Sequence, residues 1–262
     1  ILIPHFRIEI SEHILGVLGE FWRKSTMFYR KLTAFAGAAL LALAAVAMSF
    51  AADNTDQRNT SPLNLAILIQ DDLDSQVSNE LGVTRDFIRS LPSGSRVMVG
   101  YLTTGRLQVR QPFTTDLERA ARSLRRPVSS DAASPYNPYV EVIEAIKSFN
   151  GLKGKNAVLL ISDGLDTSRG FDISSSGNTI DLLRAIEHAN KYNVAVFTFY
   201  APSVGLTSRS RLAASYGQNS LNRLAKDTGG KAYFQGSSGF VTFNSYFKRL
   251  RQTMNERELF SS

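Results

Sequence analysis

The sequence predicts an α/β fold in which a mostly parallel sheet carries helices on both faces. Two runs, Leu65–Ile69 and Ala157–Ile161, are apolar at every position, which suits strands that are covered on both sides in a parallel sheet. Segments with helical spacing alternate with these runs and with further strands, as in chains built from strand–helix–strand units. We therefore expect one domain over residues 63–255, a length sufficient for a full core.

The first half of the domain is expected to begin with strand 65–69 and a helix over 78–90, whose apolar residues recur at helical spacing. A turn at 92–94 separates this helix from strand 96–102. Strand 107–109 follows after a few residues, so it is expected to pair with 96–102 as an antiparallel hairpin at the edge of the sheet.

Two further helices carry start signals. Thr115 is expected to cap a helix that begins at Asp116, because Glu118 stands at the capping-box spacing. Asn137 or Pro138 is expected to open the next helix, which ends near residue 149.

The second half of the domain continues the alternation of strands and helices. The expected elements are strand 158–161, helix 180–192, strand 194–199, helix 221–228, strand 232–234 and helix 243–254. Gly229 and Gly230 supply a stop signal after helix 221–228. Two long loops rich in Ser, Gly and Arg, 165–178 and 201–218, follow strands, so both are expected where the parallel strands end.

Residues 27–51 have the pattern of a secretory signal peptide. Met27 precedes the basic pair Arg30-Lys31 and a charge-free apolar run, and Ser49-Phe50-Ala51 provides small residues at a cleavage site. We therefore expect export to the periplasm or secretion, and an uncleaved N-terminal anchor is the alternative. Residues 1–26 are expected to be a non-native upstream extension, 52–62 a flexible leader and 256–262 a C-terminal tail.

Composition narrows the functional classes. The chain has no Cys, which excludes thiolate catalysis and zinc sites built from Cys. Its net charge of +7 is mildly basic, and nucleic acid is not an expected partner of an exported protein. His188 is the one histidine within the expected domain, which argues against a hydrolase with a Ser-His-Asp triad.

Carboxylates directly follow two of the buried strands. Asp71, Asp72 and Asp74 come after the first apolar run, and Asp163 comes after the run that ends at Ile161. Because parallel strands end at one edge, where α/β proteins bind ligands, these acids are expected to share one cleft. Oxygen ligands of this kind suit Mg²⁺. In the alternative interpretation the acids cap the following helix and hold no metal.

The order of elements resembles the von Willebrand factor type A (vWA) domain, from Leu63 to about Met254. The segments that carry the resemblance are the acid-ended first strand, Gly100–Thr103, Leu159–Gly164 and Leu221–Phe234. The last segment, with its Thr-Gly-Gly sequence, is similar to exported bacterial members of unknown role. The resemblance implies a three-layer, Rossmann-like vWA fold with one antiparallel edge strand.

The resemblance also implies a metal-ion-dependent adhesion site, in an altered form. In the family, an Asp-x-Ser-x-Ser motif, a loop Thr and the strand-four Asp hold a divalent cation, which is usually Mg²⁺, with Ca²⁺ or Mn²⁺ as the alternatives. Aligned on the apolar run, the matching positions are Gln70, Asp72, Asp74, Ser134 and Asp163. A register shifted by one residue would use Asp71, Leu73 and Ser75, and Ser130 is the alternative to Ser134.

We therefore expect an exported binding module and not an enzyme. Its partner would be another protein or an extracellular polymer, with membrane contact only through an uncleaved signal segment. The residues expected to contact the partner are Asp71, Ser75, Tyr136, Asp166 and Phe171. Aromatic side chains on loops at this edge are typical anchors of an interface.

The alternative function is a magnesium-dependent phosphatase. The segment Ile67–Ser75 also resembles the opening of haloacid-dehalogenase-type phosphatases, in which Asp72 would attack phosphorus and Asp74 would serve as the acid–base. The lysine-bearing loop of that family has no match in this sequence, and two strands still follow the candidate late acidic motif at Asp163.

Overall fold

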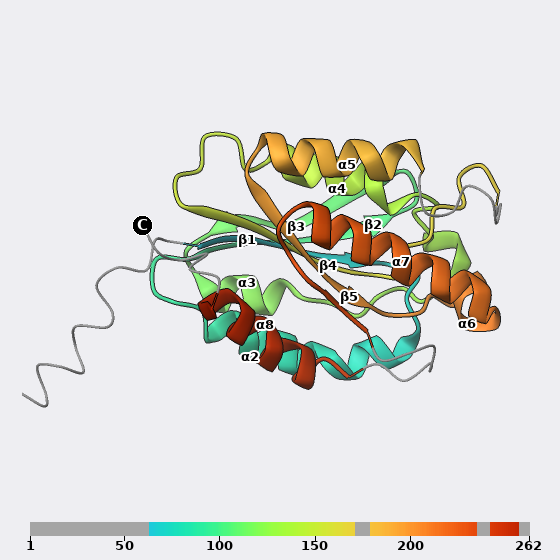
Figure 1. Ribbon diagram of the computed structural model, residues 1–262. Coiled ribbons are helices and arrows are strands. Elements are labelled where there is room, and N and C mark those ends of the chain that lie inside the picture. The colour runs from blue at the N-terminus through green and yellow to red at the C-terminus, as the bar shows by residue number, and fades with distance from the viewer. Residues whose placement is uncertain (1–62, 171–178, 235–241, 257–262) are drawn as a thin grey trace, which may run out of the picture. The chain divides into compact units, whose positions relative to one another are not determined.

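The computed structural model describes residues 63–170, 179–234 and 242–256. They form a six-stranded sheet in the order β3-β2-β1-β4-β5-β6, with helices on both faces (Figure 1). The β2–β3 pair is antiparallel and the other pairs are parallel, so the predicted fold class is confirmed. The expectations for residues 1–62, for Phe171 and for the tail beyond Glu256 lie outside the described residues.

Strand β1 (Leu63–Gln70) is the centre of the sheet and is buried at every residue. It pairs with β2 (Arg96–Thr103) on one side and with β4 (Lys155–Ser162) on the other. Its continuous apolar run follows from this position, because both faces of the strand meet a helical layer. Strand β5 (Val194–Tyr200) pairs with β4, and β6 (Ala232–Tyr233) completes the sheet. All the parallel strands end at one edge, which we call the carboxyl edge.

The outer strand β3 (Arg106–Thr114) is longer than the predicted strand 107–109. It pairs with β2 over its whole length, with register shifts in the second half. Pro112 has no backbone N–H to donate, and an edge strand tolerates it because one side has no neighbouring strand. The prediction was too short because several exposed polar residues interrupt the apolar pattern of this strand.

Alternate residues of the central strands face two separate apolar layers. The helices on one face are α2 (Leu81–Arg89), α3 (Leu117–Ser123) and α8 (Asn244–Glu256) (Figure 1). The helices on the other face are α4 (Pro138–Lys147), α5 (Ile180–Lys191) and α7 (Arg211–Asp227). In these described parts of the chain, no helix combines the length and the apolarity that crossing a membrane requires.

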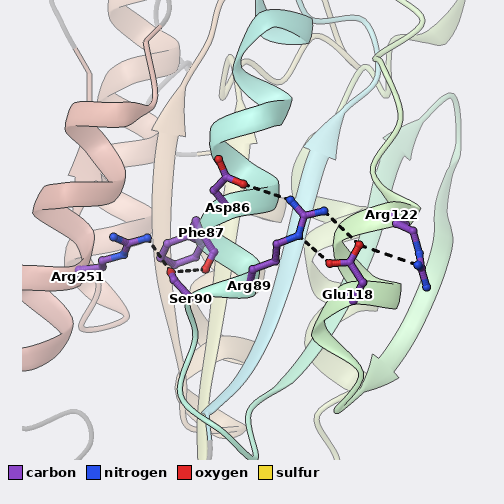
Figure 2. A network of polar contacts seen from close by, with 7 residues as sticks. All are labelled: Asp86, Phe87, Arg89, Ser90, Glu118, Arg122 and Arg251. Atoms are coloured by element: carbon purple, nitrogen blue, oxygen red, sulfur yellow. Dashed lines mark hydrogen bonds and ion pairs between the residues drawn. The ribbon is translucent and has the colours of Figure 1, made fainter.

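Two helix starts on the first face differ from the prediction. The 3-10 helix η1 (Ser75–Glu80) precedes α2, so the predicted helix 78–90 is α-helical only from Leu81. Asp116, and not Thr115, caps α3, because its carboxylate accepts a hydrogen bond from the backbone N–H of Arg119 at 2.8 Å. Glu118 accepts from Arg89 of α2 at 2.7 Å and so joins the two helices (Figure 2).

Helix α7 begins ten residues before the predicted helix 221–228, so most of the expected loop 201–218 is helical. The short helix α6 (Leu206–Arg209) precedes it, and Ser210 caps α7 by accepting from Ala213. The buried side of this first half consists of small residues, which give no apolar periodicity to read. At Gly217 a Cβ would overlap the carbonyl oxygen of Asp163, so this helix packs directly on the end of β4.

Aromatic side chains attach α8 to the sheet and to α2. The ring of Phe247 stacks on that of Phe87 with centroids 4.4 Å apart and meets Phe199 of β5 edge-on at 5.0 Å. At the start of this segment, the backbone N–H of Phe243 donates to the Glu80 carboxylate at 2.7 Å. Further along the helix, Arg251 donates to the Ser90 hydroxyl at 2.6 Å (Figure 2).

Replacing Phe247 with Ala should lower the free energy of unfolding by about 3–5 kcal/mol, because the buried ring leaves a cavity between α8, α2 and β5. Lys248→Ala, at the exposed neighbouring position, is the matched control and should change stability by about 0.5 kcal/mol or less. Urea denaturation measures both. A loss below about 1 kcal/mol for Phe247→Ala would show that α8 does not contribute to the core.

Candidate functional site

The acidic ends of β1 and β4 lie side by side at the carboxyl edge. The two strands pair in register, with Ile69 opposite Ile161. The chain segments that leave these two residues therefore start from neighbouring positions, as predicted from the two apolar runs. This pairing brings Gln70 and Asp72 from one strand end to Ser162 and Asp163 from the other.

Gln70 joins the two strand ends through both groups of its side-chain amide. Its nitrogen Nε2 donates to Asp72 Oδ1 at 2.8 Å and to Asp163 Oδ1 at 3.1 Å. Its oxygen Oε1 accepts from the Ser162 hydroxyl at 2.5 Å and from the backbone N–H of Asp163 at 3.3 Å. The side chain is 2% exposed, so these hydrogen bonds form in a site shielded from water.

The carboxylate of Asp163 is surrounded by hydrogen-bond donors of the protein itself. Besides Gln70, the backbone N–H of Leu165 donates to Oδ1 and the Thr207 hydroxyl donates to Oδ2, both at 3.1 Å. The segments that follow β1 and β5 pair above it through an antiparallel bridge between Leu73 and Ser203. This bridge closes over the end of β4, and it leaves Asp163 4% exposed.

Burial makes both carboxylates harder to ionise. Loss of water, followed by the charge of Asp163, raises the pKa of Asp72 to about 6. Loss of water also raises the pKa of Asp163, against the hydrogen bonds that it accepts. Hydrogen bonds from Gln70 and Ser134 oppose the rise of the pKa at Asp72, so the amide bridge stabilises the charged form of the pair.

A pocket of about 180 Å³ opens at the carboxyl edge beside these acids. Gln70, Asp72, Asp163 and Ser134 are among its lining residues. The remaining lining residues are Asp131, Pro135, Tyr136, Leu165, Thr167, Ser203, Gly205 and Leu206. The structure thus brings four of the five predicted metal-site residues to one pocket. Ser134, the residue expected to match the loop Thr of the family, forms a side-chain hydrogen bond with Asp72.

Asp74, the fifth of these residues, turns away from the pocket. Its carboxylate accepts from the backbone N–H of Gln76 at 2.9 Å and caps η1. The expected grouping of three carboxylates does not form, because the cap on η1 takes Asp74. Across the described ranges, no three acidic, His or Cys residues stand close enough together to hold a metal ion.

Asp71 is not available to a partner, contrary to the sequence-based expectation. It is 3% exposed, and the Arg125 guanidinium donates to its two oxygens at 2.6 and 2.8 Å. The same guanidinium lies 3.9 Å from the centre of the Tyr101 ring. This ion pair fixes the start of the loop that carries Ser130 and Ser134, because Val128 also donates its N–H to Asp71 at 3.0 Å.

The other residues expected to contact a partner have different positions. Tyr136 is 51% exposed on the pocket rim, with a backbone φ of 55°, and its carbonyl accepts from the backbone N–H of Thr167 at 2.6 Å. Ser75 is exposed in the first turn of η1. Asp166 accepts from the N–H and hydroxyl of Ser168 and shapes the neighbouring loop. Phe171 lies outside the described residues.

The residues present do not fit a divalent cation. Such an ion needs free oxygen ligands, whereas the space between Asp72 and Asp163 is occupied by the NH₂ group of Gln70. The Asp163 carboxylate already accepts from three protein donors, and Asp74 is committed to η1. We therefore derive no role for a metal in the chemistry of this pocket.

Sequence reasoning missed Arg125, Thr207 and Ser203 as parts of the site. The arginines at positions 119, 122, 125 and 126 have the pattern of a solvated basic helix face, yet Arg125 follows α3 and neutralises a buried acid. Thr207 and Ser203 lie in a segment expected to be an open loop, where hydroxyl residues carry no distinguishing pattern. The one signal that was present is Arg125 itself, a basic residue that could neutralise an acid buried at the carboxyl edge of the sheet.

Arg125→Ala should lower the free energy of unfolding by about 3–5 kcal/mol, because the buried Asp71 carboxylate would lose its counter-charge. Arg122→Ala is the matched control, since Arg122 is 68% exposed and lies 4.0 Å from Glu118; its expected loss is below about 1 kcal/mol. Denaturant unfolding of both variants gives the comparison. Equal losses would show that the Asp71–Arg125 pair stabilises the fold no more than an exposed ion pair does.

Asp72→Asn should become more stable relative to the wild type as the pH rises from about 4 to about 7. Between the ordinary pKa of 3.8 and the folded pKa of about 6, folded wild type holds a proton that the unfolded chain has released, so its stability falls as pH rises. The variant has no carboxyl group at this position and so does not lose stability in this way. The difference in the free energy of unfolding between the two proteins should therefore change by up to about 3 kcal/mol. Denaturant unfolding of both proteins across this range measures it, and parallel curves would contradict the raised pKa.

Comparison with known proteins finds similarity at the level of structure. No family model matches the chain, and no characterised protein matches its sequence. The conserved hypothetical protein BatB from Bacteroides thetaiotaomicron aligns with a TM-score of 0.50 at 16% identity, over 74% of this chain and 98% of that chain. The human COPII-coat protein Sec24c aligns with a TM-score of 0.52 at 10% identity, over 74% of this chain and 32% of that chain.

The VWA domain of SpRpn10 aligns with a TM-score of 0.45 at 12% identity, over 71% of this chain and 94% of that chain. Identities this low carry no statement about activity. The alignments with BatB and Sec24c cover 74% of this chain, whose sheet has the order β3-β2-β1-β4-β5-β6. Together these observations identify the fold: this chain has a von Willebrand factor A-like fold.

Proposed function

We propose that this domain binds a protein partner through its carboxyl edge, as an exported interaction module and not as an enzyme. The observation that carries the proposal is the distribution of exposed apolar side chains. The described residues at this edge include a set of large apolar side chains that are more than a third exposed: Val128, Tyr136, Val140, Ile180, Leu183, Leu206 and Leu212.

The topology explains why these side chains share one edge. Val140, Ile180 and Leu212 lie in the first turns of α4, α5 and α7. Each of these helices leads into a parallel strand (β4, β5 or β6), so each begins at the carboxyl edge (Figure 1). Tyr136 and Leu206 belong to the lining of the pocket. Exposed apolar side chains at one edge of the domain, two of them in the lining of a polar pocket, support a surface that binds another protein.

The pocket itself supports binding more than catalysis. Its two acids are held by hydrogen bonds from Gln70, Ser134 and Thr207. A phosphatase would need Asp72 and Asp74 together, and Asp74 instead caps η1, so the geometry gives that alternative no support. The signal-like pattern of residues 27–51 supports export.

The proposed interface predicts that Tyr136→Asn weakens partner binding by about tenfold or more, because an exposed rim aromatic is a typical anchor. Asn suits this test because it tolerates the positive φ of 55° at position 136. Val109→Thr is the matched control, since Val109 is 42% exposed on β3, away from the carboxyl edge, and it should leave binding unchanged.

The experiment has two steps. Immobilised wild-type domain captures proteins from an envelope extract of the producing cell, and each captured protein is then purified and titrated against wild type and both variants. A partner that binds all three equally would place the interface elsewhere. A partner that loses affinity only for Tyr136→Asn supports the carboxyl edge.

A further inference from the structure

The vWA resemblance implies a cation held by oxygen atoms at the two strand ends, and in this protein the side-chain amide of Gln70 lies between the two acids. Gln70 Nε2 lies 2.8 Å from Asp72 Oδ1 and 3.1 Å from Asp163 Oδ1. Both carboxylates are almost fully buried, so their charges cannot be compensated by water. The NH₂ group supplies one N–H to each of them.

The surrounding donors require this orientation of the amide. The backbone N–H of Asp163 can only donate, and it points at Gln70 Oε1 at 3.3 Å. An amide turned by about 180° would place its NH₂ group against this N–H and its oxygen against two carboxylates. These hydrogen-bonding requirements therefore place the NH₂ group between the two acids.

We propose that the Gln70 amide does by hydrogen bonding what a divalent cation would do by coordination, joining the ends of β1 and β4, so that the carboxyl edge works without metal. The amide delivers two donors from a side chain that is already anchored by the Ser162 hydroxyl and the Asp163 N–H. It needs no ion from the surroundings. This inference concerns the unliganded domain, so it stands or falls independently of any partner.

The same geometry indicates that one atom decides between the two kinds of site. In an octahedral Mg²⁺ site the ligand oxygens lie about 2.0–2.1 Å from the ion, so neighbouring oxygens are about 2.9 Å apart. The distances from Gln70 Nε2 to the two acid oxygens, 2.8 and 3.1 Å, bracket that value. Replacing the NH₂ group by oxygen, as in Gln70→Glu, would therefore place a third carboxylate oxygen at ligand spacing.

The first test uses the wild-type domain alone. Calorimetric titration with MgCl₂, CaCl₂ and MnCl₂ should give no saturable binding up to about 10 mM, a range that would reveal about millimolar affinity, and EDTA should leave the thermal midpoint unchanged. Saturable binding of any of these ions to wild type, lost in Asp163→Asn, would overturn the proposal.

The second test asks for a gain of metal binding. Gln70→Glu should acquire saturable binding of Mn²⁺ or Mg²⁺, and about 10 mM of the ion should raise its thermal midpoint by about 5 °C or more. The gain should disappear in Gln70→Glu/Asp163→Asn. Gln108→Glu is the matched control, because it adds the same charge to the sheet outside the pocket, and it should gain nothing.

Every outcome of these two tests either supports or contradicts the proposal. If Gln70→Glu folds only when metal is added, the required compensation of three acids supports the proposal. If it folds and binds no ion, the NH₂ group is not what keeps a cation from this site, and the proposal is wrong. If the variant folds under neither condition, the wild-type titration decides: absence of saturable binding supports the proposal, and saturable binding overturns it.

Discussion

The double pairing of β1 is the constraint on which the rest of this structure depends. The strand is buried at all of its residues and is hydrogen-bonded to β2 and β4 in parallel register. A slip by one residue would turn its Leu and Ile side chains to the wrong layers, so the register is strongly specified. Because the register is fixed, the position of Gln70 against Asp163 is fixed as well.

The carboxylates at this edge therefore have structural roles, which the acidic sequence did not indicate. Each is paired or hydrogen-bonded within the protein: Asp71 with Arg125, Asp74 with the N–H of Gln76, Asp72 with Gln70 and Ser134, and Asp163 with Gln70 and Thr207. A buried acid without such a group would cost several kcal/mol. Tyr136 and Leu206 in the lining of the pocket remain exposed, which is why the proposed interface rests on rim side chains and not on the acids.

The central strands and the closeness of the two acidic ends could be predicted from the sequence, because fully buried parallel strands give unbroken apolar runs. The first half of α7 could not, since its buried side is made of Ala213, Ala214 and Gly217, which signal no apolar face. The roles of the acids were equally hidden. Asp71 and Asp72 are neighbours of one residue type, and only the direction of each side chain separates an ion pair with Arg125 from a contact with Gln70.

The bridge between Leu73 and Ser203 has a consequence for how the domain matures. Its two halves are separated by most of the domain, and Thr207 donates to Asp163 from the same late segment. Contacts this distant in sequence cannot form before the intervening chain has been made. A growing polypeptide therefore has Asp163 without this bridge and without Thr207 until the segment after β5 has been made. Completion of the pocket therefore needs residues from both halves of the domain, and a chain that ended before Ser203 would leave the end of β4 without these contacts.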